Sequence, residues 1–185
     1  MKRQDYISFD EMYMGIAAIA SYRVKDPSTQ NGFVIVNERN RIVSIGYNGF
    51  PDGCDDDEFP WTSPEKYPYA EHSERNAIYN VDISLRGCRG YLYSERGYYP
   101  CSDCARGIIQ KGIKKIYMAC AIKEEKSVTG TYSWDETLRM FKATGTEIII
   151  MENAAESFLK LSNKLKVSSD IINKIEGSVK WSRKY

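Results

Sequence analysis

The chain has 185 residues, with 26 Lys and Arg against 25 Asp and Glu and a net charge of +1. This length suits one well-packed domain and is too short for two comfortable ones. Acids and bases are interleaved, so the chain has no strong basic stripe for nucleic acid, and no apolar run approaches the ~18 residues that span a membrane. We therefore expect a small-molecule partner, without nucleic acid or membrane. Because residues 1–5 begin no signal segment, we expect a cytoplasmic location.

The first seventy residues predict a helix, a hairpin and a long loop. Ser8 and Glu11 form a capping-box pattern, which opens a helix that ends near Arg23. Runs of β-branched residues at 33–36 and 42–45 predict a hairpin that turns at 38–40. Residues 48–70 hold four of the six prolines and predict an irregular loop. Loops of this length in compact domains are usually functional.

Helices and strands alternate through the rest of the sequence. We expect helices at 72–80, 101–111 and 134–144, and strands at 91–93, 115–118 and 147–151. This alternation predicts an α/β domain in which helices cover the faces of a sheet. We assign that domain to residues 1–152 and a helical C-terminal extension to residues 153–185. The role of the extension is open.

A candidate zinc site combines the only histidine, His72, with the pair Cys101 and Cys104. One imidazole and two thiolates leave the fourth tetrahedral position open for water, which is the catalytic arrangement of Zn²⁺. Zinc lowers the pKa of its bound water to about 7, and the resulting hydroxide can attack an amidine carbon such as C4 of cytosine. Glu74 is not needed as a ligand, so it can accept the water proton and then protonate the ring nitrogen and the departing ammonia.

Two other interpretations of the cysteines are open at this point. Thioredoxin-like redox sites use the same Cys-x-x-Cys spacing, although the upstream His-x-Glu is not part of that pattern. A structural zinc site could take Cys54, Cys88 or an acid as its fourth ligand, but it would leave Glu74 without a role. Cys88 and Cys120 lie beside expected strands and are most simply buried small hydrophobes.

The pattern His-x-Glu followed by Pro-Cys-x-x-Cys is the signature of zinc nucleobase deaminases. The chain resembles the cytidine and deoxycytidylate deaminase superfamily, and most closely its deoxycytidylate deaminases. The similarity extends from about residue 9 to residue 151. The segments that carry it are 26–32, 46–54, 66–78 and 100–105. The zinc motif alone is typical of the whole superfamily, whereas the loop at 46–61 together with Tyr67-Pro68-Tyr69 is more specific.

The resemblance implies a three-layer α-β-α cytidine-deaminase-like fold with a central mixed five-stranded sheet, usually assembled as a homohexamer. It also implies hydrolysis of dCMP to dUMP and ammonia. In the allosteric members of the family, dCTP with Mg²⁺ activates the enzyme and dTTP inhibits it. We therefore expect both nucleotides as effectors and Mg²⁺ as a second cofactor beside Zn²⁺.

The same resemblance implies roles for individual residues. Asn48 would contact the sugar or the base. A monophosphate needs a nearby Arg or Lys, and the candidates for the 5′-phosphate are Arg23, Lys25, Ser28 and, more weakly, Asn76. A solvated helix end is the alternative for the first two. The expected effector contacts are Gly49, Asp55, Asp56 and Trp61.

Some positions depart from the family pattern. Phe33 replaces an alanine that in the family lies close to the base, so it could reshape the pocket. Glu71 adds a carboxylate near the metal, which Arg75 could neutralise. Four acids at 55–58 could bind Mg²⁺ with a triphosphate, repel an anion, or form a solvated loop.

Two rival functions are open. One is a related deaminase that acts on dCTP, CMP or adenosine in tRNA. The other is a catalytically silent deaminase fold that serves as a regulatory or nucleic-acid-binding subunit. The missing basic rim argues against a tRNA substrate, and the intact zinc motif with Glu74 argues against a silent subunit.

Overall fold

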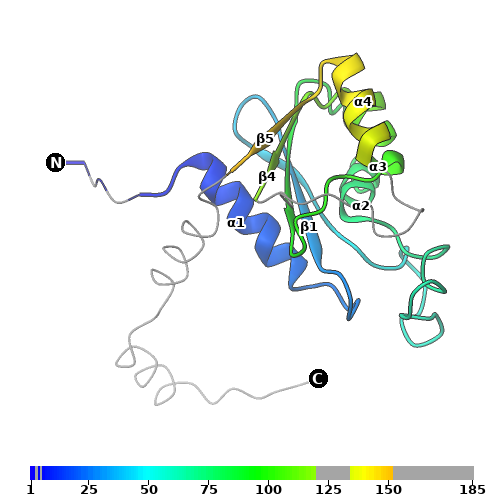
Figure 1. The fold of residues 1–185 in the computed structure, drawn as a ribbon. Coiled ribbons are helices and arrows are strands. Elements are labelled where there is room, and N and C mark those ends of the chain that lie inside the picture. The colour runs from blue at the N-terminus through cyan, green and yellow to red at the C-terminus, as the bar shows by residue number, and fades with distance from the viewer. Residues whose placement is uncertain (3, 5, 120–133, 152–185) are drawn as a thin grey trace, which may run out of the picture.

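The computed structural model describes residues 1, 2, 4, 6–119 and 134–151. Its centre is a mixed sheet with the strand order β2-β1-β3-β4-β5 (Figure 1). β1 pairs antiparallel with β2 and β3, whereas β3, β4 and β5 run parallel. The strand bounds are Asn31–Val36 (β1), Ile42–Tyr47 (β2), Arg89–Ser94 (β3), Lys115–Met118 (β4) and Glu147–Ile150 (β5). The predicted mixed five-stranded sheet is confirmed.

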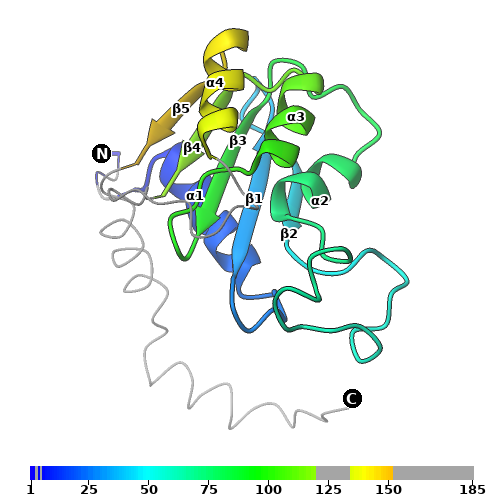
Figure 2. The same ribbon diagram turned by 45° about the vertical axis from the view of Figure 1, so that its right-hand side comes forward.

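Helices cover both faces of this sheet, so the predicted three-layer fold is also confirmed (Figures 1 and 2). α1 (Phe9–Ser21) lies on one face, and α2 (Ser73–Tyr79), α3 (Ser102–Gln110) and α4 (Trp134–Thr144) lie on the other. The capping box of α1 is present, since the amide of Glu11 donates to Ser8 Oγ at 3.2 Å and the amide of Ser8 donates to Glu11 Oε2 at 2.6 Å. The segment 153–185 and Cys120 lie outside the described residues.

Two glycines let helices approach the sheet closely. A Cβ atom at Gly32 of β1 would lie 1.9 Å from the carbonyl oxygen of Ala17 in α1. A Cβ atom at Gly46 of β2 would lie 2.3 Å from the carbonyl oxygen of Ser73 in α2. Any larger side chain would push these helices away from the sheet. Gly46 therefore helps to set the position of α2, which begins directly after His72.

Phe33 is fully buried in the core between the sheet and the helices α2–α4. Its Cα pairs with that of Leu92 on β3, yet its ring tip lies 2.2 Å from the place where Gly90 would carry a Cβ atom. The ring therefore leans toward the amino end of β3, away from the end that leads to Cys101. Phe33 therefore packs in the core, and its ring occupies the space that a side chain at residue 90 would need.

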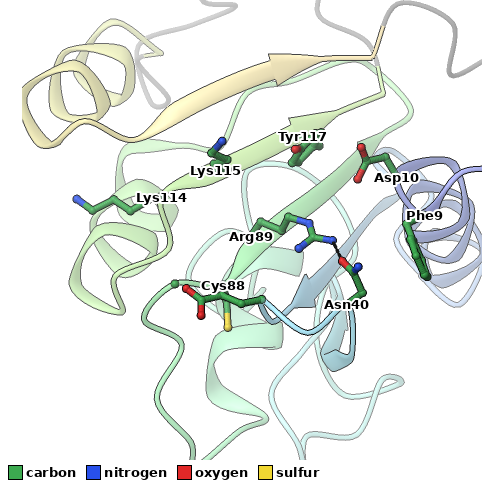
Figure 3. Close-up of a pocket in the computed structure, with 10 residues that line it drawn as sticks. Phe9, Asp10, Asn40, Cys88, Arg89, Lys114, Lys115 and Tyr117 are labelled. Carbon is green, nitrogen blue, oxygen red and sulfur yellow. Dashed lines mark hydrogen bonds between the residues drawn. The ribbon is translucent and has the colours of Figure 1, made fainter.

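The opposite end of the sheet carries an open cavity of about 620 Å³ (Figure 3). It lies at the amino ends of β3 and β4, and its charged lining includes Asp10, Arg89 and Lys115. The guanidinium of Arg89 donates to the side chains of Asn40 and Tyr91, so its polar groups are already occupied. No residue predicted for catalysis or binding lines this cavity, so the site lies elsewhere.

Candidate active site

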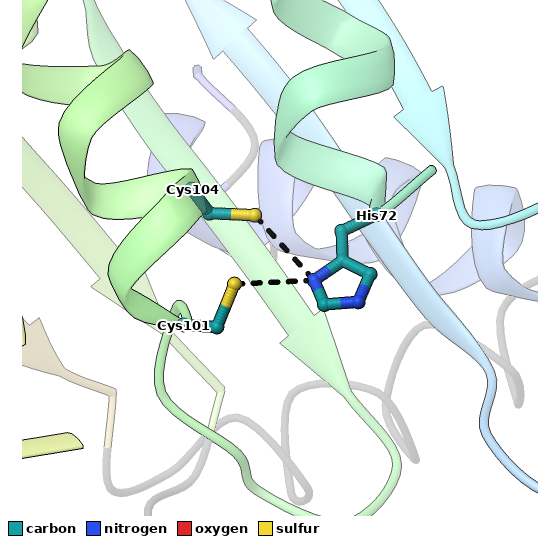
Figure 4. Close-up of side chains that lie close together, drawn as sticks. All are labelled: His72, Cys101 and Cys104. Carbon is teal, nitrogen blue, oxygen red and sulfur yellow. Dashed lines mark hydrogen bonds between the residues drawn. The ribbon is translucent and has the colours of Figure 1, made fainter. Parts of the chain in front are cut away.

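Two helix starts on the same face of the sheet bring the predicted zinc ligands together (Figure 4). His72 is the N-cap of α2, Cys101 is the N-cap of α3, and Cys104 lies in the first turn of α3. The Nδ1 atom of His72 lies 3.3 Å from Cys101 Sγ and 3.5 Å from Cys104 Sγ. Both cysteines are buried and free of disulfides. The three side chains therefore converge on one point.

This geometry fits a tetrahedral zinc ion. Zn–N bonds of about 2.0 Å and Zn–S bonds of about 2.3 Å place tetrahedral N and S ligands about 3.5 Å apart. The observed separations of 3.3 and 3.5 Å match that value. Within the part of the chain that the structure describes, His72, Cys101 and Cys104 form the only cluster of three such side chains, so Cys54 and Cys88 do not join it. Three ligands leave a fourth position for a reacting molecule.

The protonation of the two thiols is linked. The pKa of Cys101 is lowered, chiefly because Cys104 hydrogen-bonds to its sulfur and then because His72 does the same. The pKa of Cys104 is raised, because this hydrogen bond retains its proton and burial disfavours its thiolate. Zinc binds thiolates, so binding of the metal would release the retained proton.

Glu74 is buried beside the three ligands, with 4% of its surface exposed. Its Oε2 accepts a hydrogen bond of 3.0 Å from Ser73 Oγ. Burial raises the pKa of the Glu74 carboxyl above its ordinary value, and the opposing charge of His72 is a smaller influence. A carboxyl with a raised pKa can both take and return a proton near neutral pH, as general acid–base catalysis requires.

Three side-chain hydrogen bonds join α2 and the segment before α3 to neighbouring elements, and the sequence predicted none of them. Ser44 of β2 donates to the carbonyl of Ala77 in α2 at 2.7 Å. Asn76 Nδ2 donates to the carbonyl of Tyr47 at 3.0 Å, so this candidate for phosphate binding joins α2 to the end of β2. Thr137 of α4 donates to the carbonyl of Pro100 at 2.9 Å, directly before Cys101. Such bonds join residues far apart in sequence and leave no local pattern.

Asn48 joins three segments at the edge of the site. Its Oδ1 accepts from the amide of Asn31 at 2.8 Å, and its Nδ2 donates to the carbonyl of Thr29 at 3.0 Å. The next residue, Gly49, exchanges two backbone hydrogen bonds with Glu71, which precedes His72. The amide of Asn48 thus links the segment 29–31 to the loop before the zinc histidine. Its contact with a sugar or base is still a prediction.

The candidates for phosphate binding lie in a network of acids and bases. Ser28 Oγ donates to Asp26 at 2.8 Å and accepts from Lys66, while Lys25 pairs with Asp56. The guanidinium of Arg23 lies over the ring of Tyr47, 5.9 Å from its centre. Lys66 and Asp26 were missed, although both lie in segments that carry the family resemblance.

The loop that holds the expected effector contacts is packed through aromatic side chains. The indole of Trp61 donates to the carbonyl of Asp56 at 2.9 Å, and its ring centre lies 4.1 Å from that of Phe50. Asp55 accepts a hydrogen bond of 3.0 Å from the amide of Asp57. The described residues 55–58 do not form a cluster of three metal-binding side chains, and Mg²⁺ binding there stays a prediction.

Comparisons with known proteins agree with the site. Residues 7–120 match the family model of the cytidine and deoxycytidylate deaminase zinc-binding region. Human deoxycytidylate deaminase is 44% identical to this chain over 122 residues. The match covers 62% of this chain and 66% of the human protein, so the chain spans about two thirds of that relative. The probable deoxycytidylate deaminase of Drosophila melanogaster is 39% identical over 158 residues, or 79% of this chain and 73% of that protein.

A solved structure supports the fold. The dCMP deaminase of cyanophage S-TIM5, determined in complex with dCMP and dUMP, superposes with a TM-score of 0.57 at 23% identity, covering 79% of this chain and 100% of the phage protein. The family model alone covers more than half of the chain, and it spans all three zinc ligands and Glu74. The chain therefore belongs to the cytidine and deoxycytidylate deaminase family.

Proposed function

We propose that this chain is a zinc-dependent deaminase that hydrolyses dCMP to dUMP and ammonia. The observation that carries the proposal is the cluster of His72, Cys101 and Cys104 beside the buried carboxyl of Glu74. A redox pair would not need the histidine or the acid. A structural zinc site would need a fourth ligand, and the described residues supply only three.

In this proposal the protein side chains hold the metal and move protons. His72, Cys101 and Cys104 would bind Zn²⁺, which supplies a Lewis acid that makes water nucleophilic near neutral pH. The carboxylate of Glu74 takes a proton from the attacking water. As a carboxylic acid, Glu74 then gives that proton to the ring nitrogen and assists the departure of ammonia. Burial of Glu74 supports both roles, because its raised pKa brings the two protonation states closer in energy.

The choice of dCMP rests on the relatives and on the segments around the site. Human, mouse and Drosophila relatives that carry the name deoxycytidylate deaminase are 39–45% identical to this chain. Lys25 and Ser28 lie in the segment after α1, where Lys25 pairs with Asp56 and Ser28 donates to Asp26, so this segment offers a cation and a hydroxyl for a 5′-phosphate. Asn48 fixes this segment beside the loop that leads to His72.

Regulation and assembly belong to the same proposal. We propose that dCTP with Mg²⁺ activates and dTTP inhibits through the loop that contains Gly49, Asp55, Asp56 and Trp61, and that the protein assembles as a homohexamer in the cytoplasm. The ordered packing of Phe50 against Trp61 supports a loop with a defined shape. None of the helices within the described ranges has the length and apolar character to cross a bilayer.

The test is ammonia release from dCMP by the zinc-loaded protein, measured with and without dCTP. Turnover that rises with dCTP supports the substrate and the regulatory loop together. Turnover that ignores dCTP supports the enzyme and removes the regulation. No turnover of dCMP in either condition overturns the proposed substrate, and assays with dCTP, CMP and a tRNA anticodon stem then decide among the related deaminases and a silent subunit.

A further inference from the structure

We propose that Arg75 is a positioning residue that ties the two zinc-bearing helix starts together through Glu71 and Asp103. This inference rests on the proposed binding of zinc by His72, Cys101 and Cys104. Arg75 lies in the first turn of α2, directly after Glu74. Its partners lie next to the ligands: Glu71 precedes His72, and Asp103 lies between Cys101 and Cys104.

The first part of the link is a fixed carboxylate. The backbone of Glu71 is held by two hydrogen bonds to Gly49, of 2.8 and 3.1 Å, at the end of β2. Its side chain is 24% exposed, so water screens its charge only partly. Because the backbone of Glu71 is held by the loop that follows β2, its carboxylate offers an anchor for a cation.

The second part is a two-point contact between Glu71 and Arg75. Arg75 Nε lies 3.0 Å from Glu71 Oε2, and Arg75 Nη2 donates to Glu71 Oε1 at 3.0 Å. The hydrogen bond from Nη2 fixes one edge of the guanidinium against Glu71, and the close approach of Nε to Oε2 adds charge attraction without a second hydrogen bond. The ring of Tyr79 lies under the guanidinium carbon at 5.6 Å and limits its movement on that side. These contacts leave the remaining nitrogen, Nη1, facing α3.

The third part crosses to the other helix. Arg75 Nη1 lies 3.8 Å from Asp103 Oδ2, in the first turn of α3. The other oxygen of Asp103 pairs with Arg106, three residues later in the same helix. Arg75 and Arg106 thus hold the same carboxylate, but only the contact with Arg75 joins α3 to α2. This difference makes Arg106 a matched control for the charge of Arg75.

The contact matters for a metal that is bound from both sides. Zinc can bind to all three ligands only if the start of α2 and the start of α3 keep their separation. Before the metal binds, the ligand side chains do not fix that separation by themselves. Arg75 also places a positive charge beside Glu71 and Asp103, the two acids that lie next to the ligand positions. Because these ion pairs are partly exposed, removing them should weaken the link by a factor of about 2 to 5.

The experiment measures zinc, independently of activity. Wild-type protein, Arg75→Ala, Arg75→Lys and Arg106→Ala are loaded with zinc, and its transfer to a chromogenic chelator is followed over time. We expect Arg75→Ala to lose zinc about 2- to 5-fold faster than wild type. Arg106→Ala should lose zinc at nearly the wild-type rate. Arg75→Lys should fall between them, since an ammonium keeps the charge but not the two-point contact.

A general loss of folding is separated from a loss of zinc by two further measurements. Thermal unfolding of the metal-free proteins should give similar midpoints for Arg75→Ala and Arg106→Ala. If Arg75→Ala does not fold, Glu71→Gln and Asp103→Asn remove the same link from the other side and should both speed zinc release. Equal zinc release from Arg75→Ala and Arg106→Ala would overturn the inference. Failure of the wild-type protein to retain zinc would instead overturn the proposed function.

Discussion

The ammonium group of Lys66 lies 2.6 and 2.8 Å from the two carboxylate oxygens of Asp26, and both side chains are almost completely buried. Lys66 also donates to Ser28, so its three N–H groups all have acceptors. The carbonyl of Lys66 accepts from the amides of Tyr69 and Ala70, in the turn that leads to His72. This ion pair therefore connects the segment after α1 to the loop before the zinc histidine.

Removing one partner of this pair should be costly. Lys66→Met leaves the carboxylate of Asp26 buried without a counter-charge, which typically costs about 3–5 kcal/mol. In the double variant Asp26→Leu with Lys66→Met, two apolar side chains replace two charges, and most of that loss should be recovered. Urea denaturation of the three proteins measures both effects. A single variant within 1 kcal/mol of wild type would show that water already reaches the pair.

The ion pair also predicts a dependence of stability on acid. Burial opposes ionisation of Asp26, but the hydrogen bonds from Lys66 and Ser28 outweigh it and lower the pKa of Asp26 below 3.8. A carboxyl whose pKa is lower in the folded protein stabilises the fold above about pH 4 and loses that contribution as the pH falls through its folded pKa. Midpoints of urea unfolding from pH 7 to pH 3 should therefore fall more steeply for wild type than for the double variant. Parallel curves would contradict this assignment.

The two roles at the zinc site can be separated by mutation. Glu74→Gln should retain zinc and lose turnover by about 10²- to 10⁴-fold or more, because the amide cannot take a proton from water. Cys104→Ser should lose zinc and turnover together, since it removes one of three ligands. Zinc content by atomic absorption and ammonia release from dCMP measure the two effects. Wild-type turnover by Glu74→Gln would exclude Glu74 as the proton carrier.

The close contact of α2 with Gly46 predicts that a side chain at this position would weaken zinc binding. In Gly46→Ala the new Cβ atom would meet the backbone of Ser73 and Ala77 at 2.3 and 2.4 Å, so α2 must move away from β2. We expect a loss of stability of about 1–3 kcal/mol, as for other overpacked sites, and weaker binding of zinc. Gly107→Ala is the control, because its Cβ atom would meet only Ile78 at an ordinary 3.5 Å. Equal zinc retention by the two variants would contradict the coupling.

A substitution of Phe33 separates a role in core packing from a role in substrate selection. Its ring is fully buried and leans toward Gly90, so Phe33→Ala should create a cavity and cost about 3–5 kcal/mol of stability. KM for dCMP should change little, since the ring points away from the end of β3 that leads to the zinc ligands. A shift in substrate preference from dCMP to another cytosine nucleotide, with stability retained, would instead support a role in the pocket.

The sequence by itself determined most of the elements, because local physics decides them. Ser8 and Glu11 mark the start of α1, the period of apolar residues separates helices from strands, and the observed bounds of α4 and β4 are the predicted ones. The deaminase motif also predicted His72, Cys101 and Cys104 as zinc ligands and Glu74 as the proton carrier, and the structure brings the three ligand side chains together.

Only the tertiary structure decided which distant side chains share one place. Lys66 and Asp26 are 40 residues apart, and Arg75 meets Asp103 across two helices, so neither pair leaves a periodic pattern in the chain. The direction of Phe33 follows from the register of β1 against β3 and from the missing side chain of Gly90. Such contacts depend on how the helices pack against the sheet. That packing is determined by many side chains from distant parts of the sequence, and no short segment specifies it.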